Sequence, residues 1–310
     1  MMKILVTGAT GFVGRYLVND LSKTDEVIAC VRKKSNLLPS SVQQIVGNNF
    51  FDIAIPKDTD VIVHLAGIAH NKNNSVDEFK KINLDGTLEL AHKALEANIK
   101  RFVFISSIGV NGNSTHGKAF TEQDTPNPTN DYTKSKYEAE KALAKLFENT
   151  HIDLVIIRPP LIYAHDAPGN FSKLLMLIKL GQFLPFGCTQ NQRSFIAIEN
   201  LVSFITTCIY HDTKINETFL IADDEVISTK QLIQCLSSGM GKSMILLSVP
   251  TKLLSTLADV TGKVSIFEQL YGNLKIDNRK AKKFFNWHPP KHSLNALKEV
   301  GNLYRNNKND

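Results

Sequence analysis

The sequence predicts an α/β protein whose core is a doubly wound, mostly parallel β-sheet with helices on both faces. In the first half, short apolar runs alternate with longer amphipathic segments, as in successive βαβ units. These runs are apolar at almost every position, which is typical of strands buried on both faces of a parallel sheet. The rhythm changes after Pro159-Pro160, where segments rich in Gly, Pro and Phe predict a smaller C-terminal lobe.

The expected elements follow in chain order. A short strand at Ile4–Val6 leads into a helix from about Phe12 to Ser22. The next apolar runs predict strands at Glu26–Val31 (EVIACV), Gln44–Val46, Asp60–Ala66 (DVIVHLA), Arg101–Ser106 (RFVFIS) and Asp153–Arg158 (DLVIIR). Amphipathic segments predict helices at Ser75–Ala97 and Asp131–Asn149, and beyond residue 160 near 171–180, 200–211 and 229–239. The polar tail Tyr304–Asp310 should be frayed.

The first strand runs directly into three glycines spaced three apart, in KILVTGATGFVG (3–14). Gly8 and Gly11 have no Cβ, so the chain can turn sharply and phosphate oxygens can approach the backbone amides. Gly14 lets the following helix pack close to the strand, and the N-terminus of that helix directs free N–H groups to the same point. A glycine triplet alone also occurs in ordinary turns. Its place between a strand and a helix predicts a Rossmann-type dinucleotide site.

The composition excludes several classes of function. The chain has 310 residues, of which 43% are hydrophobic, so it can bury a large core as one composite unit or two domains. The net charge of +6 comes without a dense basic run, which argues against a nucleic-acid partner and suits an anionic ligand. The four cysteines are far apart and form no CxxC pair, so we expect free thiols and no metal site. No signal peptide or membrane-length apolar run is evident, which predicts a cytoplasmic protein with no membrane partner.

A tyrosine and a lysine, Tyr132 and Lys136, lie four residues apart on one face of a predicted helix. A free tyrosine has a pKa of about 10, and a neighbouring ammonium favours the phenolate, so we expect Lys136 to lower the pKa of Tyr132. Ser106 and Ser107 end the preceding strand at the edge where the glycine turn lies. A Tyr-x-x-x-Lys pair alone is common on solvated helices, but this position predicts a proton-transfer site.

Taken together, these motifs resemble the extended short-chain dehydrogenase/reductase superfamily and its NAD-dependent epimerase/dehydratase family, whose fold is of the Rossmann type. The resemblance covers nearly the whole chain: TGATGFVG (7–14), DVIVHLAG (60–67), INLDGT (82–87), FISSIGVNG (104–112), YTKSK (132–136), RPPLIY (158–163), RSFIAIENL (193–201) and FFNWHPP (284–290).

The resemblance implies roles for individual residues. Ser107, Tyr132 and Lys136 are the implied catalytic residues, and Asn83 would brace Lys136, usually through water, unless it is only a polar residue inside a helix. The implied contacts to NADP(H) or NAD(H) are Gly8, Thr10, Gly11, Phe12, Val13, Gly14, Arg32, Asn48, Leu65, Ala66, Gly67, Asn83, Ser106, Tyr132, Lys136 and Pro159.

Departures from the family pattern narrow the reaction. Nucleotide-sugar 4,6-dehydratases carry an adjacent Asp-Glu pair just after the substrate-side hydroxyl, where this chain has Ile108 and Gly109, so dehydration is not expected. Enzymes that prefer NAD end the second strand with an acidic residue, where this chain has Val31 followed by Arg32. A guanidinium there suits the 2′-phosphate of NADP(H), although a basic loop is the alternative. The resemblance implies that the residue at position 48 contacts the adenine of the coenzyme. Relatives usually have Asp there, whereas this chain has Asn48.

The C-terminal lobe resembles the sugar-nucleotide branch of the superfamily. Asn170 follows the expected loop, and Phe186 could face a uracil or simply pack in the core. Arg193 matches an arginine that holds a diphosphate through two parallel hydrogen bonds, or it could form a surface ion pair with Glu199. We therefore expect a UDP-sugar substrate that contacts Ser107, Asn170, Phe186 and Arg193.

These expectations converge on hydride transfer at C4 of a UDP-sugar. The favoured reaction is reduction of a UDP-4-keto-6-deoxy-N-acetylhexosamine for surface polysaccharide (O-antigen type) synthesis. The alternatives are a UDP-hexose 4-epimerase, a reductase of flavonoid-like or steroid-like ketones, and a dinucleotide sensor without catalysis. The expected domains are 1–160 with part of 190–222 for the cofactor, and 161–190 with 223–310 for the nucleotide sugar. The resemblance also implies a homodimer formed through the helices near 75–97 and 131–149.

Overall fold

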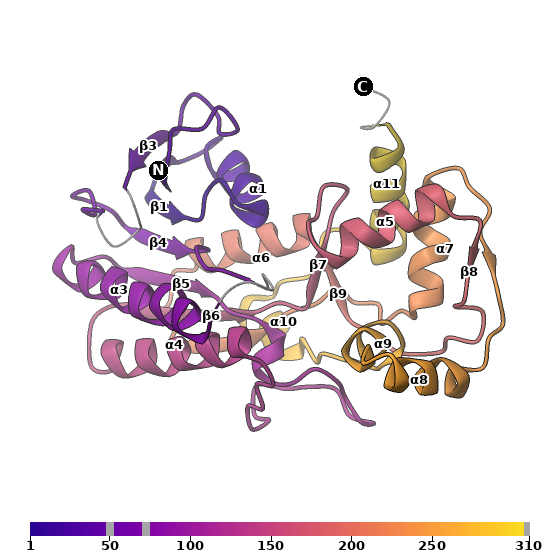
Figure 1. Cartoon of the computed structure of the whole chain (residues 1–310). Coiled ribbons are helices and arrows are strands. Elements are labelled where there is room, and N and C mark those ends of the chain that lie inside the picture. The colour runs from indigo at the N-terminus through magenta and orange to yellow at the C-terminus, as the bar shows by residue number, and fades with distance from the viewer. Residues whose placement is uncertain (48–52, 70–74, 307–310) are drawn as a thin grey trace.

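The structure is a computed structural model, and it describes residues 1–47, 53–69 and 75–306. One end of the molecule holds the main sheet with its covering helices, and the other holds helices from the C-terminal half of the chain (Figure 1). Of the predicted site residues, Asn48 lies outside the described residues. The division of the chain into two domains at the expected boundaries stays a prediction.

The main sheet has seven strands in the order β10-β6-β5-β4-β1-β2-β3, and every neighbouring pair is parallel. The strands are β1 Lys3–Thr7, β2 Glu26–Val31, β3 Gln43–Val46, β4 Val61–His64, β5 Arg101–Ile105, β6 Asp153–Arg158 and β10 Glu217–Leu220. The chain builds outward from β1 to β3 and then returns to build from β4 on the other side of β1. This reversal confirms the doubly wound fold, and it places the ligand crevice at the carboxyl ends of β1 and β4.

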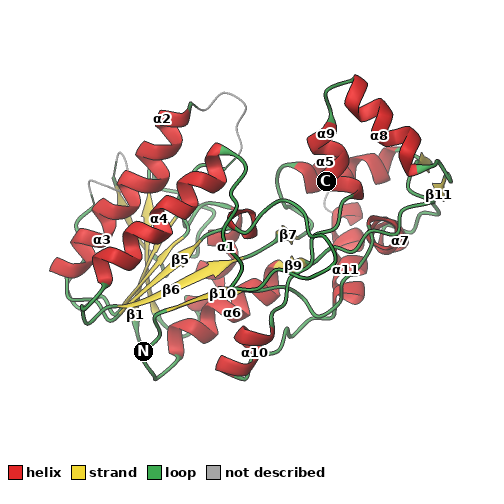
Figure 2. Cartoon of the chain, turned by 90° about the horizontal axis from the view of Figure 1, so that it is seen from below, coloured by secondary structure: helices red, strands yellow, loops and turns green. Residues whose placement is uncertain are grey.

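Helices cover both faces of the sheet (Figure 2). On one face lie α1 (Phe12–Leu21) and α6 (Ile198–Tyr210), whose apolar residues join the same buried cluster. The other face is covered by α4 (Asp131–Phe147) and by the predicted Ser75–Ala97 helix. That helix consists of α2 (Val76–Phe79), a π-helical turn η1 (Lys80–Asp85) and α3 (Gly86–Glu96). Single π turns inside α-helices are frequent at functional sites, so η1 indicates that this segment contributes to one.

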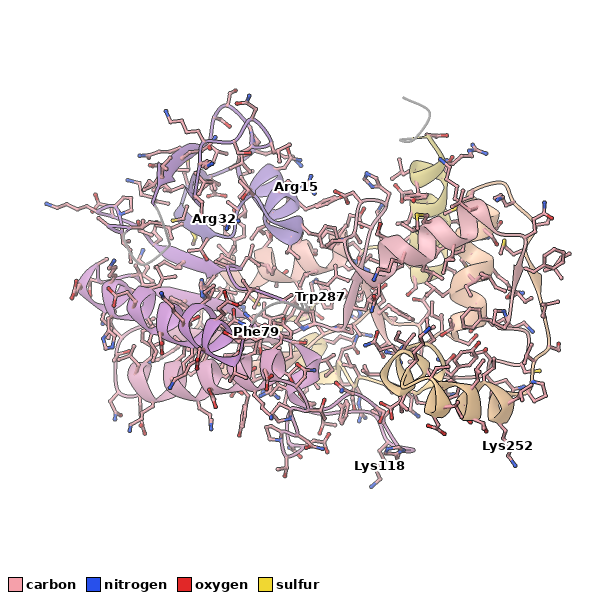
Figure 3. All side chains as sticks on the ribbon, viewed as in Figure 1. Arg15, Arg32, Phe79, Lys118, Lys252 and Trp287 are labelled. Carbon is pink, nitrogen blue, oxygen red and sulfur yellow. The ribbon has the colours of Figure 1, made fainter. Side chains whose placement is uncertain are left out.

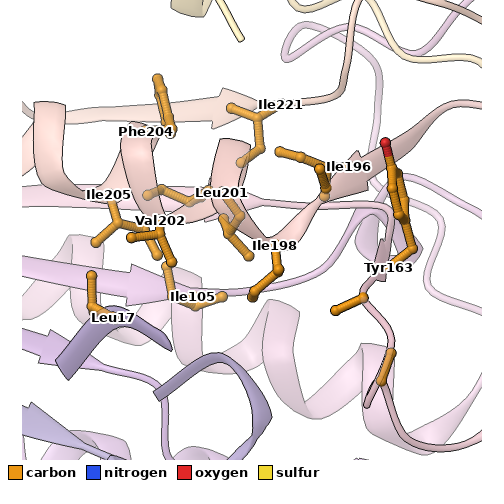
Figure 4. Close-up of a cluster of buried hydrophobic side chains, with 14 of the residues drawn as sticks. Leu17, Ile105, Tyr163, Ile196, Ile198, Leu201, Val202, Phe204, Ile205 and Ile221 are labelled. Atoms are coloured by element: carbon orange, nitrogen blue, oxygen red, sulfur yellow. The ribbon is translucent and has the colours of Figure 1, made fainter. Parts of the chain in front are cut away.

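The core between α1, α6 and the sheet fixes the position of the glycine turn. Leu17 of α1, Ile105 of β5 and Leu201 of α6 are each 8% exposed or less and pack in one cluster (Figure 4). Burying such a side chain contributes about 1.5–3 kcal/mol relative to exposure. The first helix is therefore held firmly against the sheet, with its N-terminus at the carboxyl end of β1.

The remaining elements form the C-terminal part of the molecule. They are β7 Leu161–Tyr163, α5 Asn170–Leu180, β8 Phe183–Leu184, β9 Phe195–Ala197, α7 Thr229–Gly239, β11 Ile245–Leu246, α8 Thr251–Val260, α9 Val264–Tyr271, α10 Arg279–Phe285 and α11 Ser293–Asn306. β7 pairs with β9, and β8 pairs with β11. The helices predicted near 171–180, 200–211 and 229–239 are present as α5, α6 and α7.

The terminal helix α11 corrects the expectation of a frayed tail from Tyr304. Tyr304 lies inside α11 and is 6% exposed. Two glycines let α11 approach α7 closely, because a Cβ at Gly301 would lie 2.2 Å from the Leu236 carbonyl oxygen and one at Gly239 would lie 2.0 Å from that of Lys298. The tail prediction is therefore wrong as far as Asn306, and residues 307–310 lie outside the described part of the chain.

Two features of the described residues concern membranes and metals. No helix there combines the length and the apolarity that crossing a bilayer requires. No group of three or more His, Cys, Asp or Glu side chains in residues 1–47, 53–69 and 75–306 could hold a metal ion.

Candidate functional site

The glycine turn forms a close backbone cradle at the end of β1. Gly8 has a φ of +68°, and a Cβ there would lie 2.7 Å from the backbone nitrogen of Ala66. A Cβ at Gly14 would lie only 2.1 Å from the carbonyl oxygen of Gly8. Gly11 is the N-cap of α1 and provides no side-chain hydrogen bond, so no capping side chain competes for the amides of the first turn. These amides suit a phosphate group.

Two adjoining cavities follow the carboxyl edge of the sheet, with volumes of about 300 Å³ and about 460 Å³. Both contain Gly8, Gly11, Leu65, Gly67 and Ile68, so together they form one trough. Predicted cofactor residues in the first cavity also include Phe12, Val13, Gly14, Ser106, Tyr132, Lys136 and Pro159, and those in the second include Thr10, Arg32 and Ala66. Every described residue predicted to contact the cofactor therefore lines the trough, apart from Asn83.

Apolar residues complete the lining of this trough and were not predicted from the sequence. They are Cys30, Val31, Ile53, Ile68, Ala69, Ile82, Ile105, Pro160 and Ile162. Cys30 and Val31 end β2, so their position at the carboxyl edge of the sheet was the available signal. Ile105 ends β5 and Ile162 lies in β7, whereas Ile53, Ile68 and Ile82 lie in loops and in the π turn, where an apolar residue alone does not indicate a site.

The start of α4 brings the three predicted catalytic side chains together. Asn130 caps this helix through a capping box with Thr133, which places Tyr132 in the first helical turn. The hydroxyl of Tyr132 shares a hydrogen bond with Ser107, whose Oγ also accepts from the Gly109 amide at 3.1 Å. Lys136 Nζ donates to the carbonyl oxygen of Ile105 at 2.8 Å. A phenol, an alcohol and an ammonium therefore meet at one cavity.

Burial dominates the electrostatics of this trio. It raises the pKa of Tyr132 to about 12, and the hydrogen bond to Ser107 opposes that rise. Burial also lowers the pKa of Lys136 to about 8, while the Glu140 carboxylate opposes that fall. The expectation that Lys136 lowers the pKa of Tyr132 below its ordinary value is therefore wrong for the protein alone, because desolvation of the phenolate is the largest effect on this pKa.

The surroundings hold these side chains from several directions. The centre of the Phe79 ring lies 6.4 Å from the centre of the Tyr132 ring. Phe79 is labelled in Figure 3. Lys136 Nζ lies 4.5 Å from the centre of the Phe104 ring, a cation–π distance. Glu140, one turn further along α4, binds the buried Arg158 guanidinium through both oxygens, at 2.9 and 2.5 Å. This pair satisfies the Glu140 carboxylate, which acts on Lys136, without exposing it to water.

Asn83 lies in the π turn and connects two parts of the site. Its Oδ1 accepts from the Ile68 amide at 2.9 Å, and its Nδ2 donates to the Ile68 carbonyl and to Ser135 Oγ at 3.1 and 3.0 Å. Ser135 directly precedes Lys136 in α4. Asn83 therefore ties the loop after β4 to the helix that carries the lysine, and its bracing of Lys136 through water stays a prediction.

The trough fits a dinucleotide on three observations. The glycines leave room that a Cβ would fill. Ser106 Oγ is buried at the cavity and has no hydrogen-bond partner among the described residues. The exposed Arg32 stands at the far cavity, on the same side of the molecule as α1 (Figure 3). A buried hydroxyl without a partner is costly, so a polar ligand that bonds Ser106 would be stabilising.

Of the four residues predicted to bind substrate, Ser107 lies beside Tyr132 in the trough, and the other three contact the α9 region. Asn170 Nδ2 donates to Gln269 at 2.8 Å, and the Phe186 ring stacks on Tyr271 with centroids 5.0 Å apart. The Arg193 guanidinium donates to the Gly272 carbonyl at 3.0 Å, and burial lowers its pKa to about 10. The alternative ion pair between Arg193 and Glu199 is wrong, because Glu199 pairs with Lys291 instead. Core packing, the alternative for Phe186, fits its 6% exposure.

A larger hollow of about 760 Å³ lies elsewhere, between the end of α4 and β10. It contains Lys145, Lys214 and Lys280 but none of the predicted site residues. It lies at the other end of β6 from the glycine turn, beside Leu154, so it does not adjoin the trough.

Comparisons with known proteins agree with this arrangement. The chain is similar to the UDP-glucose 4-epimerase of Vibrio cholerae, with 36% identity over 313 residues that cover 97% of this chain and 95% of the relative. Its fold matches the UDP-glucose 4-epimerase of Thermotoga maritima, solved with UDP-glucose, with a TM-score of 0.80 at 20% identity over the full length of both chains. The UDP-glucuronic acid 4-epimerase of Bacillus cereus, solved with NAD, also gives 0.80, at 23% identity over both full chains.

The family profile described as the NAD dependent epimerase/dehydratase family matches residues 4–222, which include the glycine turn, both serines, Tyr132, Lys136 and Arg193. This match covers more than half of the chain, and the fold and the motifs agree with it. The chain therefore belongs to the NAD dependent epimerase/dehydratase family.

Proposed function

We propose that this protein transfers a hydride at C4 of a UDP-linked sugar. The observation that carries the proposal is the meeting of Ser107, Tyr132 and Lys136 at the cavity that also contains the glycine turn. As a member of this family, the enzyme uses a nicotinamide dinucleotide, NAD(H) or NADP(H), which supplies the hydride acceptor and donor when bound.

The chain's own residues would handle the proton. Tyr132 Oη would take the C4 hydroxyl proton during oxidation and return a proton to the C4 oxygen during reduction. Its hydrogen bond with Ser107 fixes the direction of the phenol, and Ser107 would orient the C4 oxygen. Lys136 and the N-terminus of α4 would stabilise the phenolate that forms. Because burial raises the pKa of Tyr132 to about 12, this stabilisation is needed in the reacting complex.

Two versions of this chemistry differ in what happens to the keto sugar. In a 4-epimerase the sugar turns over and accepts the hydride on its other face, and the coenzyme is regenerated. The similarity to the UDP-glucose 4-epimerase of Vibrio cholerae over nearly the whole chain favours this version. It moves our preference from the 4-keto reductase, which the sequence favoured, to the epimerase.

A specific observation keeps the UDP-4-keto-6-deoxy-N-acetylhexosamine 4-reductase as the second candidate. Arg32 lines the far cavity at the end of β2, and no acidic residue ends that strand. A guanidinium there suits NADPH, the usual donor for a net reduction. The presence of Ser107, Tyr132 and Lys136 at one cavity argues against a sensor without catalysis. Binding of the UDP moiety by Asn170, Phe186 and Arg193, and a homodimer through α3 and α4, remain parts of the proposal.

Two parallel incubations test the proposal. One contains UDP-glucose or UDP-N-acetylglucosamine with NAD, and NMR reads the C4 configuration of the product. The other contains UDP-4-keto-6-deoxy-N-acetylglucosamine with NADPH, and the loss of NADPH absorbance is followed. Product in the first alone supports the epimerase, and product in the second alone supports the reductase. No product in either, with a coenzyme bound, would contradict the proposal.

A further inference from the structure

A buried histidine, His64, lies between the glycine turn and the π turn. It is the last residue of β4, is 0% exposed, and has polar partners at both ring nitrogens. Its Nδ1 lies 2.7 Å from Thr7 Oγ1, and its Nε2 lies 2.9 Å from Thr87 Oγ1. Thr7 is the last residue of β1, and Thr87 is the second residue of α3. The imidazole therefore bridges the two strands at the ligand crevice to the helix that follows Asn83.

The partners determine where the protons lie. Thr87 Oγ1 donates to the Asn83 carbonyl oxygen at 2.7 Å, and a carbonyl oxygen can only accept. Because that hydroxyl has a single proton, it must accept from His64, so Nε2 carries the hydrogen. In the neutral ring Nδ1 is then an acceptor, and Thr7 Oγ1 donates to it. Thr7 Oγ1 in turn accepts from the Ala66 amide at 3.2 Å.

All four hydrogen bonds in this series run in one direction, with each donor nearer to Ala66 and each acceptor nearer to Asn83, through Thr7, His64 and Thr87. A second proton on the ring would face the Thr7 hydroxyl and displace the hydrogen of that hydroxyl from its acceptor. A charged ring would also oppose Lys136, the charged group that faces it from α4, across the Phe104 ring that lies 5.7 Å from the imidazole. Burial keeps the pKa of His64 near 3, in agreement with a neutral ring.

The two ends of this series of hydrogen bonds, Ala66 and Asn83, belong to the two halves of the site. Ala66 lies against Gly8 of the phosphate-binding turn, where a Cβ would come within 2.7 Å of the Ala66 nitrogen. Asn83 bonds Ser135, the neighbour of Lys136. A shift of the π turn would therefore displace both the lysine and the edge of the coenzyme site.

We propose that His64 is a positioning residue that, as a neutral Nε2–H tautomer, links the phosphate-binding turn to the π turn and so sets the place of Lys136 beside Tyr132. It touches neither substrate nor coenzyme and acts through Thr87 and Asn83. The inference rests on the proposed function, because it assigns His64 a part in the same proton-transfer site.

The first test reads the tautomer and needs no turnover. In the full-length protein labelled with 15N-histidine, His64 is assigned by comparison with the His64→Gln variant. We expect a neutral ring with the proton on Nε2, unchanged between about pH 5 and pH 8. A proton on Nδ1, or titration of His64 within that range, would overturn the inference.

The second test breaks the link at Thr87 and leaves His64 in place. Thr87→Val removes the hydroxyl with little change of shape, whereas Thr87→Ser keeps it. The matched control is Thr59→Val, which removes a hydroxyl that is similarly buried and bonded to the Pro56 carbonyl at 2.7 Å, next to β4 but outside this chain of hydrogen bonds.

We expect Thr87→Val to lower kcat by about tenfold and NAD(H) affinity by several-fold, with Thr87→Ser near the wild type. The high-pH limb of kcat/KM should also move in Thr87→Val, because Lys136 changes place. Thr59→Val should lower only the melting temperature. The role would be purely structural if Thr87→Val lost the same melting temperature as Thr59→Val but kept kcat, the pH profile and NAD(H) affinity.

If the wild type acts on no UDP-sugar, the proposed function fails, while the tautomer and the calorimetric NAD(H) affinities still decide the role of His64.

Discussion

Replacing Gly14 by alanine should separate the first helix from the glycine turn. A Cβ at this position would lie 2.1 Å from the Gly8 carbonyl oxygen and 2.7 Å from Ala9 Cα, both of which are backbone atoms that cannot rotate away. The start of α1 must therefore move by about 1 Å, and overpacking of this kind costs about 1–3 kcal/mol. Two charge-assisted hydrogen bonds to a phosphate, each worth about 1.5–3 kcal/mol, would lose their geometry.

The expected result is a lower melting temperature together with a fall of about a hundredfold or more in NAD(H) affinity, measured by thermal unfolding and by calorimetry. Gly11→Ala is the matched variant, because among the residues that the structure describes a Cβ there meets only the Gly8 carbonyl oxygen, at 3.0 Å. It should lower the affinity by obstructing the phosphate and leave the melting temperature nearly unchanged. A Gly14→Ala protein that melts and binds NAD(H) as the wild type does would refute the close-packing explanation.

Three further predictions concern charge. We expect kcat/KM of the wild type to fall as the pH rises through about 8, because burial lowers the pKa of Lys136 to about 8. Lys136→Arg should remove this fall, since a guanidinium stays charged. If kcat/KM of the variant still falls near pH 8 in a pH–rate series, another group causes the fall. Arg32→Asp should shift coenzyme preference from NADP(H) towards NAD(H) by about tenfold or more in kinetic titrations, and an unchanged ratio would assign Arg32 to a basic loop. Because His64 has a pKa of about 3 when folded and 6.5 ordinarily, the unfolded chain binds the proton first. The free energy of unfolding should therefore fall by about 1.4 kcal/mol per pH unit as the pH falls from about 6 to about 3, a slope that urea titrations should find missing in His64→Gln.

Much of the nucleotide-binding half was predictable because each signal there is local. The glycine spacing, the apolar strands and the Tyr-x-x-x-Lys pair depend on neighbours within one turn or one strand, so the pattern determines the structure. Ser107 and Tyr132 meet because β5 ends, and the crossover helix α4 begins, at the same edge of the sheet. The structure accordingly brings both to the predicted cavity.

The remainder depends on contacts between residues far apart in the sequence. The π turn at Lys80–Asp85 has no composition signal, and the Arg158–Glu140 pair forms across 18 residues. The pKa of Tyr132 was predicted in the wrong direction, because the amount of burial around a phenol follows from packing that the spacing to Lys136 does not contain. The helices α8, α9, α10 and α11 were missed in the C-terminal part, although α8 and α11 carry an amphipathic pattern that could have indicated them.

The central claim is that the Tyr132 hydroxyl carries the proton in hydride transfer at C4. The most direct measurement is NMR detection of C4 conversion of UDP-glucose and UDP-N-acetylglucosamine by Tyr132→Phe, which removes one oxygen and keeps the ring that packs beside Phe79. We predict that turnover falls by about 10²-fold or more while NAD(H) and the UDP-sugar still bind. Turnover at the wild-type rate in this variant would contradict the claim.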